Sequence, residues 1–89
     1  MIVITVAASG DSVYRVTIEE GASRTTHQVT VTPADLARYA PDASAEQLLK
    51  ASFEFLLARE PKESILSRFS LPTIERYFPE YPTTIRDLL

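Results

Sequence analysis

The side chains that could do chemistry are few, and only one of them is a histidine. His27 lies in a stretch of alternating residues that places it on the same side of a predicted strand as Val29 and Val31. A histidine can act as a base or a metal ligand. A metal site needs several nitrogen, oxygen or sulfur ligands, however, and no acidic cluster lies near His27 in the sequence. We therefore predict that His27 packs at the rim of the core.

The sequence contains no motif for the other common catalytic chemistries. Serine, histidine and aspartate are all present, but no Gly-x-Ser-x-Gly segment places them together. The two glycines leave no phosphate-cradling loop, and the absence of cysteine excludes disulfides, thiolate catalysis and Cys-ligated zinc or iron. Paired acids such as Glu19 and Glu20 flank a turn, where solvated charge is their usual role. The sequence predicts a protein that is not an enzyme and has no cofactor and no metal site.

A candidate nucleic-acid site is the one binding motif that the sequence suggests. Residues 62–78 are similar to a degenerate helix-turn-helix, in which a short helix, a turn and a second helix follow one another. Ser70 replaces the usual turn glycine, the following apolar spacing is too short, and the net charge of −3 argues against non-specific binding. The simpler interpretation is two small helices packed across a longer one. Nucleic-acid binding is therefore the alternative function, through Arg59, Lys62, Arg68 and Arg76.

The predicted elements are organised around one long helix, Ser44–Glu60. Ser44 and Gln47 form a capping box at its start, and Pro61 ends it. Apolar side chains cover roughly 200° of its circumference, which is more than one neighbour can bury. The helix must therefore contact a sheet on one side and other helices or a second subunit on the other. We expect three of its side chains to be almost fully buried: Leu49, Phe53 and Leu56.

The first third of the chain predicts three strands. Alternating residues place them at 2–7, Val13–Glu20 and Thr25–Thr32, with turns at Ser9–Ser12 and Gly21–Ser23. Adjacent strands joined by short turns form an antiparallel meander, and the many threonines give it one solvent-exposed face. The apolar face must be covered by the helices that follow.

Short helices are predicted on either side of the long one. Thr32-Pro33-Ala34-Asp35 is typical of a helix start, and that helix ends before Pro41. Further short helices are expected over Glu63–Phe69 and after Ser70-Leu71-Pro72, and Thr83 or Thr84 is expected to cap a last turn.

The predicted fold is α+β and forms a single domain, residues 1–89. Residues 1–32 form a three-stranded antiparallel β-meander. Residues 33–89 form a short helix, one long central helix and two or three short helices, all packed on one face of the sheet.

The segment Phe53–Tyr81 has the sequence FEFLLAREPKESILSRFSLPTIERYFPEY. It resembles a signature, FEFLLxREPKESIL…YFPEY, of a group of short uncharacterised bacterial proteins. The resemblance covers about a third of the chain. It implies bacterial origin and a small fold that recurs within the group, and it brings no activity or site residue with it.

The sequence therefore predicts a non-enzymatic protein–protein interaction or regulatory module. A first strand without charged residues, the wide apolar arc and the tail residues Ile85, Leu88 and Leu89 predict a homodimer. Two copies of the first strand would pair in it, whereas a tail folded back over its own long helix would leave a monomer. The start, MIVITVAASGDS, predicts a strand and not a leader, and no segment reaches membrane-spanning length. We expect a cytoplasmic location and no contact with a membrane.

Overall fold

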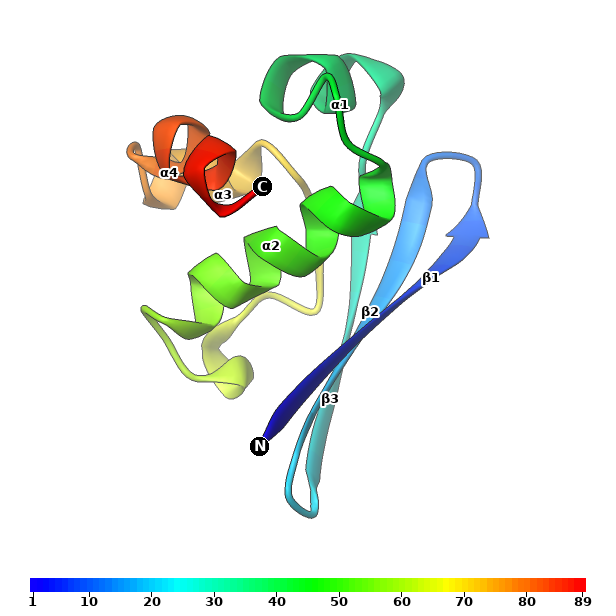
Figure 1. The fold of residues 1–89 in the computed structure, drawn as a ribbon. Coiled ribbons are helices and arrows are strands. Elements are labelled where there is room, and N and C mark those ends of the chain that lie inside the picture. The colour runs from blue at the N-terminus through cyan, green and yellow to red at the C-terminus, as the bar shows by residue number, and fades with distance from the viewer.

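The computed structural model of the chain describes residues 1–89 as one sheet with the helices gathered on one of its faces (Figure 1). The four strands are β1 (Ile2–Gly10), β2 (Val13–Glu20), β3 (Ser23–Thr30) and β4 (Arg68–Ser70). The helices are α1 (Pro33–Tyr39), α2 (Ala45–Leu57), α3 (Thr73–Tyr77) and α4 (Tyr81–Leu88), with one 3₁₀ turn, η1 (Lys62–Ser64). The α+β class is confirmed.

The sheet has the strand order β1-β2-β3-β4. The pairs β1/β2 and β2/β3 are antiparallel, so the predicted meander is confirmed, and β2 has the predicted bounds. The fourth strand pairs with β3 in the parallel direction. The prediction of a three-stranded antiparallel sheet was therefore incomplete, because the sheet is four-stranded and mixed.

The predicted helix over Glu63–Phe69 is wrong beyond its first turn. Ile65 has extended backbone angles, and the chain then runs alongside β3. The backbone N–H of Gln28 donates to the carbonyl of Ser67 at 2.8 Å, and the N–H of Leu71 donates to the carbonyl of Thr30 at 3.0 Å. These bonds pair backbone groups of Gln28 and Thr30 on the edge of β3 that faces away from β2. A helix over Glu63–Phe69 would have left these groups unpaired. A long-range pairing thus overrides the local apolar spacing.

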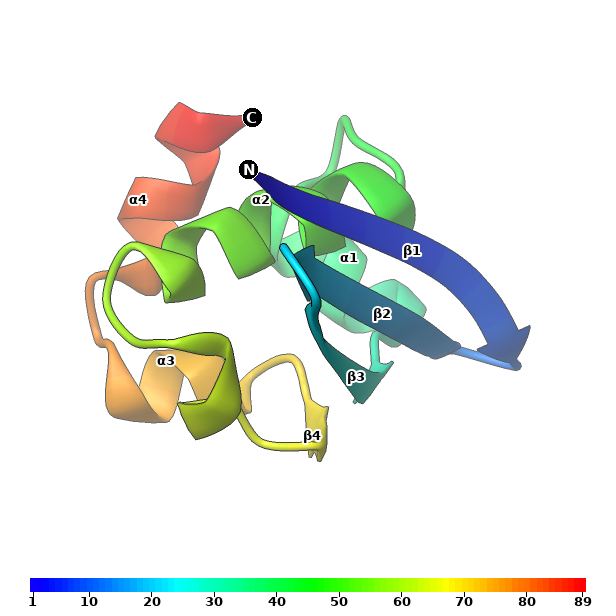
Figure 2. The same cartoon turned by 90° about the horizontal axis from the view of Figure 1, so that it is seen from below.

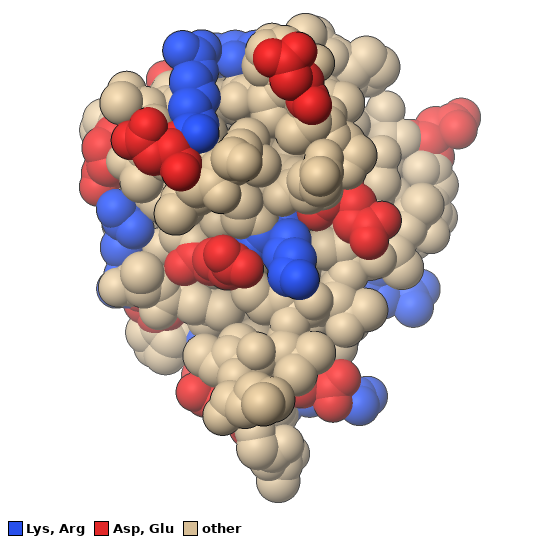
Figure 3. All heavy atoms as spheres, viewed as in Figure 1, with Lys and Arg blue, Asp and Glu red and all other residues tan.

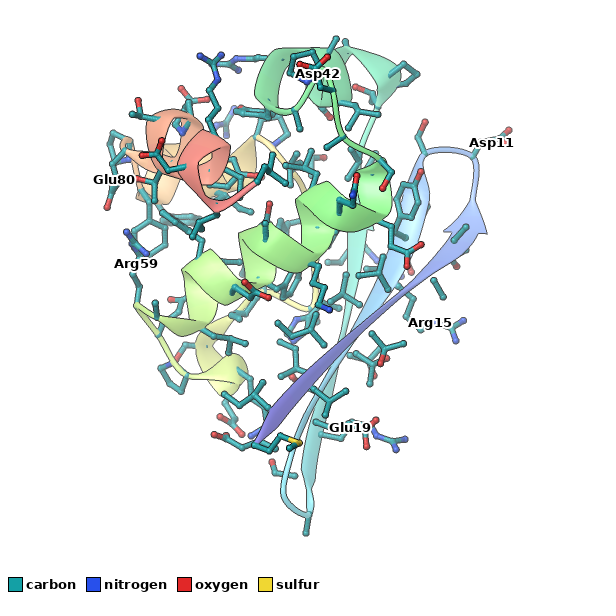
Figure 4. All side chains as sticks on the ribbon, viewed as in Figure 1. Asp11, Arg15, Glu19, Asp42, Arg59 and Glu80 are labelled. Atoms are coloured by element: carbon teal, nitrogen blue, oxygen red, sulfur yellow. The ribbon has the colours of Figure 1, made fainter.

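The two faces of the sheet differ in the way the alternation predicts. Val16, Ile18 and Val29 face the helices and are fully buried. The other face is uncovered and carries a row of threonines aligned across three strands: Thr5, Thr17 and Thr26. Figure 4 shows Arg15 and Glu19 of β2 extending from this open face, away from the helices. The helical part of the chain therefore covers only one side of the sheet.

The capping box predicted for the long helix is confirmed. The N–H of Gln47 donates to Ser44 Oγ at 3.1 Å, and the N–H of Ser44 donates to Gln47 Oε1 at 2.8 Å. The helix ends at Leu57, three residues before the predicted Glu60. The N–H of Arg59 donates to the carbonyl of Leu56, three residues back, and not to that of Phe55, which accepts from the Arg59 side chain. The start of α1 at Thr32 is confirmed as well, with its own capping box to Asp35.

The C-terminal tail forms a longer helix than predicted. Helix α4 begins at Tyr81, ahead of the expected caps Thr83 and Thr84, and has a proline in its first turn. Tyr81 and Ile85 are fully buried, so the start of α4 is anchored in the core. The last two leucines remain about half exposed, at 47% and 48%.

Helix α2 lies at the centre of the core. Leu49, Phe53 and Leu56 are buried, as predicted. The ring of Phe53 lies 5.5 Å from His27 of β3 and 6.1 Å from Phe69 of β4, measured between ring centroids. This one side chain therefore contacts both strands of the parallel pair.

Replacing Phe53 with alanine removes that contact and leaves a cavity between α2 and the sheet. We expect Phe53→Ala to lower the free energy of unfolding by about 3–5 kcal/mol, which is a large part of the stability of a small domain. Chemical denaturation measures the loss. The matched change Leu66→Ala, at an exposed apolar side chain, should cost much less. A Phe53→Ala variant as stable as the parent would contradict this packing.

A buried hydroxyl pair joins α2 to α4. Ser52 Oγ donates to the carbonyl of Leu48 at 2.6 Å, so its remaining capacity is to accept from the hydroxyl of Tyr81, which lies at 2.6 Å. Both side chains are fully buried. The pair therefore satisfies two polar groups that water cannot reach.

Removing the Ser52 hydroxyl should leave the buried hydroxyl of Tyr81 without its hydrogen-bond acceptor. We expect Ser52→Ala to lower the free energy of unfolding by about 1–3 kcal/mol, because a buried donor loses its acceptor. Adding Tyr81→Phe to that variant should recover part of the loss, since no donor is then left unpaired. If the two hydroxyls are not coupled, the losses of stability in Ser52→Ala and Tyr81→Phe should simply add in the double variant. Such additivity would contradict the hydrogen bond between them.

Candidate protein-interaction surface

His27, the only histidine, lies at the boundary between β3, β4 and α2 and is 2% exposed. Its Nδ1 lies 2.8 Å from the carbonyl of Leu66, and its Nε2 lies 2.9 Å from Thr25 Oγ1. A carbonyl can only accept, so Nδ1 donates to it, and Nε2 shares a hydrogen bond with the threonine hydroxyl. Both ring nitrogens are thus occupied within the fold, which places His27 in the core as the sequence predicts.

The structure holds Arg59 against its own helix. The guanidinium carbon lies 3.6 Å from the centroid of the Phe55 ring, and Nη1 donates to the carbonyl of Phe55 at 3.0 Å. Its Nε lies 3.5 Å from a carboxylate oxygen of Glu80, which follows α3; Figure 4 labels both residues at the outer side of the helices. Three intramolecular contacts therefore engage this predicted nucleic-acid ligand.

Lys62 is buried, with only 4% of its side chain exposed. Its ammonium lies 2.6 Å from Glu63 and 3.4 Å from Glu20, at the turn between β2 and β3. The hydrogen bond to Glu63 is the main cause that raises the pKa of Lys62 above its ordinary value of 10.5. The same bond lowers the pKa of the Glu63 carboxyl below 4.5. Lys62 therefore joins η1 to the β2–β3 hairpin.

The other two predicted ligands, Arg68 and Arg76, are exposed and make no ion pair. Arg68 pairs with Gln28 across β3 and β4, which places it on the open face of the sheet, whereas Arg76 belongs to α3. Residues 62–78 form η1, β4 and α3, so the two helices of a helix-turn-helix motif are not formed. The four basic residues do not make one surface.

Two tyrosines carry perturbed hydroxyls. Burial, followed by a 2.7 Å hydrogen bond from Tyr39 to Glu75, raises the pKa of Tyr39 to about 12. Burial also raises the pKa of Tyr81. Both phenols are therefore protonated at neutral pH. Each donates a hydrogen bond within the fold, Tyr39 to a carboxylate and Tyr81 to a serine.

A candidate site is also present at the β1 edge of the sheet. β1 is the outermost strand next to β2, and its nine residues include no charged side chain. Every other strand carries at least one. Two large apolar side chains at its start, Ile2 and Val3, are 45% and 46% exposed. An edge strand presents unpaired N–H and C=O groups, and charged side chains are the usual protection against pairing.

A groove of about 460 Å³ lies between β1 and α2. Its lining comes from the start of the strand and from the second half of the helix: Ile2, Val3, Ile4, Lys50, Glu54, Leu57 and Ala58. A strand added to β1 would direct every second side chain to the helical face of the sheet, where this groove lies.

A second depression, of about 810 Å³, lies on the other side of the same helical turn. Lys50 and Glu54 belong to its lining too, together with Leu88 and Leu89 at the end of α4. Figure 2 shows both ends of the chain on the β1 side of the molecule, and Figure 3, which views that side, shows a largely uncharged surface with scattered acidic and basic groups. We call this region the edge surface, defined by Ile2, Val3, Ile4, Lys50, Glu54, Leu57, Leu88 and Leu89.

Sequence reasoning identified only part of the edge surface. The missing charges on β1 and the apolar tail were visible in the sequence. The groove was not, because the periodicity of α2 defines a polar strip at Lys50 and Glu54 but does not place it between β1 and α4.

The structure contains no group of three or more His, Asp or Glu side chains suited to a metal ion. None of its helices combines the length and the apolar character needed to cross a bilayer. Comparisons of the chain with family models, curated proteins and solved structures found no match. The resemblance of Phe53–Tyr81 to a group of bacterial proteins stays a prediction.

The Lys62 cluster gives a pH-dependent test of how the hairpin is held. The pKa of Glu63 is lowered in the folded state, so its ionised form stabilises the fold above pH 4.5 and that contribution is lost as the pH falls further. The pKa of Lys62 is raised in the folded state, so the stability that its charged form contributes is present up to pH 10.5 and is lost as the pH rises further.

We expect Glu63→Gln to lower the melting temperature at pH 7, and the difference from the parent to shrink below pH 4.5. Melting curves followed by circular dichroism between pH 3 and pH 7 measure it. Glu46→Gln is the control, since Glu46 is exposed and has no ion pair. A difference that stays constant over this range would contradict the role of the carboxylate.

Proposed function

We propose that this protein is a non-enzymatic protein-interaction or regulatory module, which acts from the bacterial cytoplasm as a homodimer joined at β1. The observation that carries the proposal is the uncharged free edge of β1 beside an apolar groove. Catalysis would need a cluster of available reactive groups, and the buried His27, Lys62 and Tyr81 are each engaged within the fold.

The proposed partner is a second copy, because β1 is suited to pairing with itself. In an antiparallel pair about a two-fold axis, each residue faces a residue from the same strand. A charged side chain near the axis would then lie close to its own symmetry mate, and β1 contains no charged side chain. Pairing would join two four-stranded sheets into one continuous sheet of eight strands.

The size of the chain favours the same arrangement. A protein of 9.9 kDa buries a smaller share of its surface than a larger one, so an interface adds substantially to its stability. Four of its exposed large apolar side chains lie on the edge surface: Ile2, Val3, Leu88 and Leu89. A dimer through this surface would remove them from water. Nucleic-acid binding through Arg68 and Arg76 stays the alternative prediction, with less support, since Arg59 and Lys62 are engaged in intramolecular contacts.

Light scattering at micromolar concentration tests the dimer directly. We expect a mass near twice 9.9 kDa for the parent. Val3→Lys should move the mass toward the monomer, because it puts an exposed charge on the pairing edge. Thr26→Lys is the matched control on the open face of β3, an inner strand of the sheet, and it should remain dimeric. A parent mass near 9.9 kDa would contradict the homodimer.

A further inference from the structure

Lys50 and Glu54 form a charged ridge between the two depressions of the edge surface. They lie one turn apart on α2, and both line the groove beside β1 as well as the depression beside α4. Both side chains are exposed, and neither makes an ion pair within the chain. The other charged side chains that line the two depressions are Asp42 and Arg86, both in the depression beside α4, and the apolar side chains Ile2, Leu57 and Leu88 flank the ridge.

The groove places this ridge beside the start of β1, where we set the two-fold axis. It brings Ile2–Ile4 beside the stretch of α2 from Lys50 to Ala58. An axis that passes next to Ile4, perpendicular to the sheet, makes Ile4 face its own symmetry mate and places Ile2 opposite Val6 of the partner subunit. These residues all lie on the helical face of the strand, since Ile4 and Val6 pack against the core.

The same axis places the two copies of α2 antiparallel to each other on one side of the joined sheet. An antiparallel pair of helices whose symmetry centre lies midway between positions 50 and 54 brings each of these positions to the other in the second copy. The opposite charges on a single turn are then self-complementary, because every Lys50–Glu54 contact is accompanied by its symmetric equivalent.

We infer that Lys50 and Glu54 determine partner choice: Lys50 of each copy pairs with Glu54 of the partner subunit across the β1–β1 seam. The inference rests on the proposed homodimer and adds the register and the residues that select a second copy of this chain. Strand pairing alone is tolerant of sequence and register, whereas reciprocal charges oppose a wrong partner or a shifted strand.

Charge reversal at one position tests the ridge. In Lys50→Glu, each of the two cross-seam contacts becomes an acid facing an acid, and in Glu54→Lys each becomes a lysine facing a lysine. We expect each single variant to weaken the homodimer by about tenfold or more in dissociation constant, measured by analytical ultracentrifugation. Arg76→Glu and Asp11→Lys are the matched controls, because they change the net charge equally at exposed, unpaired positions on α3 and in the β1–β2 turn, away from the proposed contact.

Recombining the charges makes the test specific. An equimolar mixture of Lys50→Glu and Glu54→Lys should form a heterodimer at concentrations where each alone is mostly monomeric, since both contacts again join opposite charges. Native mass spectrometry with one variant isotope-labelled identifies that species. The double variant carrying both changes should recover the homodimer for the same reason.

The failures of this inference and of the proposed function are distinguishable. A dimeric parent whose two single variants dimerise like the controls would overturn the role of the ridge and leave the homodimer standing. The role of the ridge is overturned in the same way if both single variants are weakened but their mixture forms no heterodimer. A parent that is monomeric at micromolar concentration would overturn both the homodimer and the pairing of Lys50 with Glu54.

Discussion

The packing of Phe53 between β3 and β4 is the contact on which the rest of the structure depends. Its ring holds α2 against the sheet and touches Phe69 on the strand that returns after η1. Because that returning segment pairs with β3, a fourth strand is added at the β3 edge of the sheet, and none is added at the β1 edge. The segment after α2 therefore covers part of the β3 edge, and the β1 edge stays free.

The parts of the fold that the sequence predicts are those set by neighbours along the chain. The capping box of α2, the start of α1, the bounds of β2 and the buried positions of α2 follow from short-range spacing and are all present. The fourth strand could not be predicted in this way. Its pairing joins segments as far apart as His27 and Leu66, 39 residues in sequence, and the apolar residues after Ser64 fit a helix just as well.

The candidate site also combines features that the sequence shows with features that only tertiary packing sets. The sequence shows that β1 lacks charge and that the tail ends in leucines, so an association surface was predictable in kind. The basic residues were misleading, since composition does not reveal that Lys62 is buried between two carboxylates or that Arg59 covers Phe55. The position of Lys50 and Glu54 between β1 and α4 depends on tertiary packing, which no periodicity encodes.

The parallel β3–β4 pair also has a consequence for how the chain folds. The β1–β2 and β2–β3 hairpins close over short turns, whereas β4 reaches β3 only after α1 and α2 have been passed. Closing so long a loop carries an entropic cost before any contact compensates it, and pairings of this kind slow folding. Until it forms, the meander exposes β3 as well as β1, so a refolding chain has two open edges at which another chain can add. Crowded refolding conditions thus favour intermolecular strand pairing at Gln28–Thr30 of β3, which β4 covers in the finished fold.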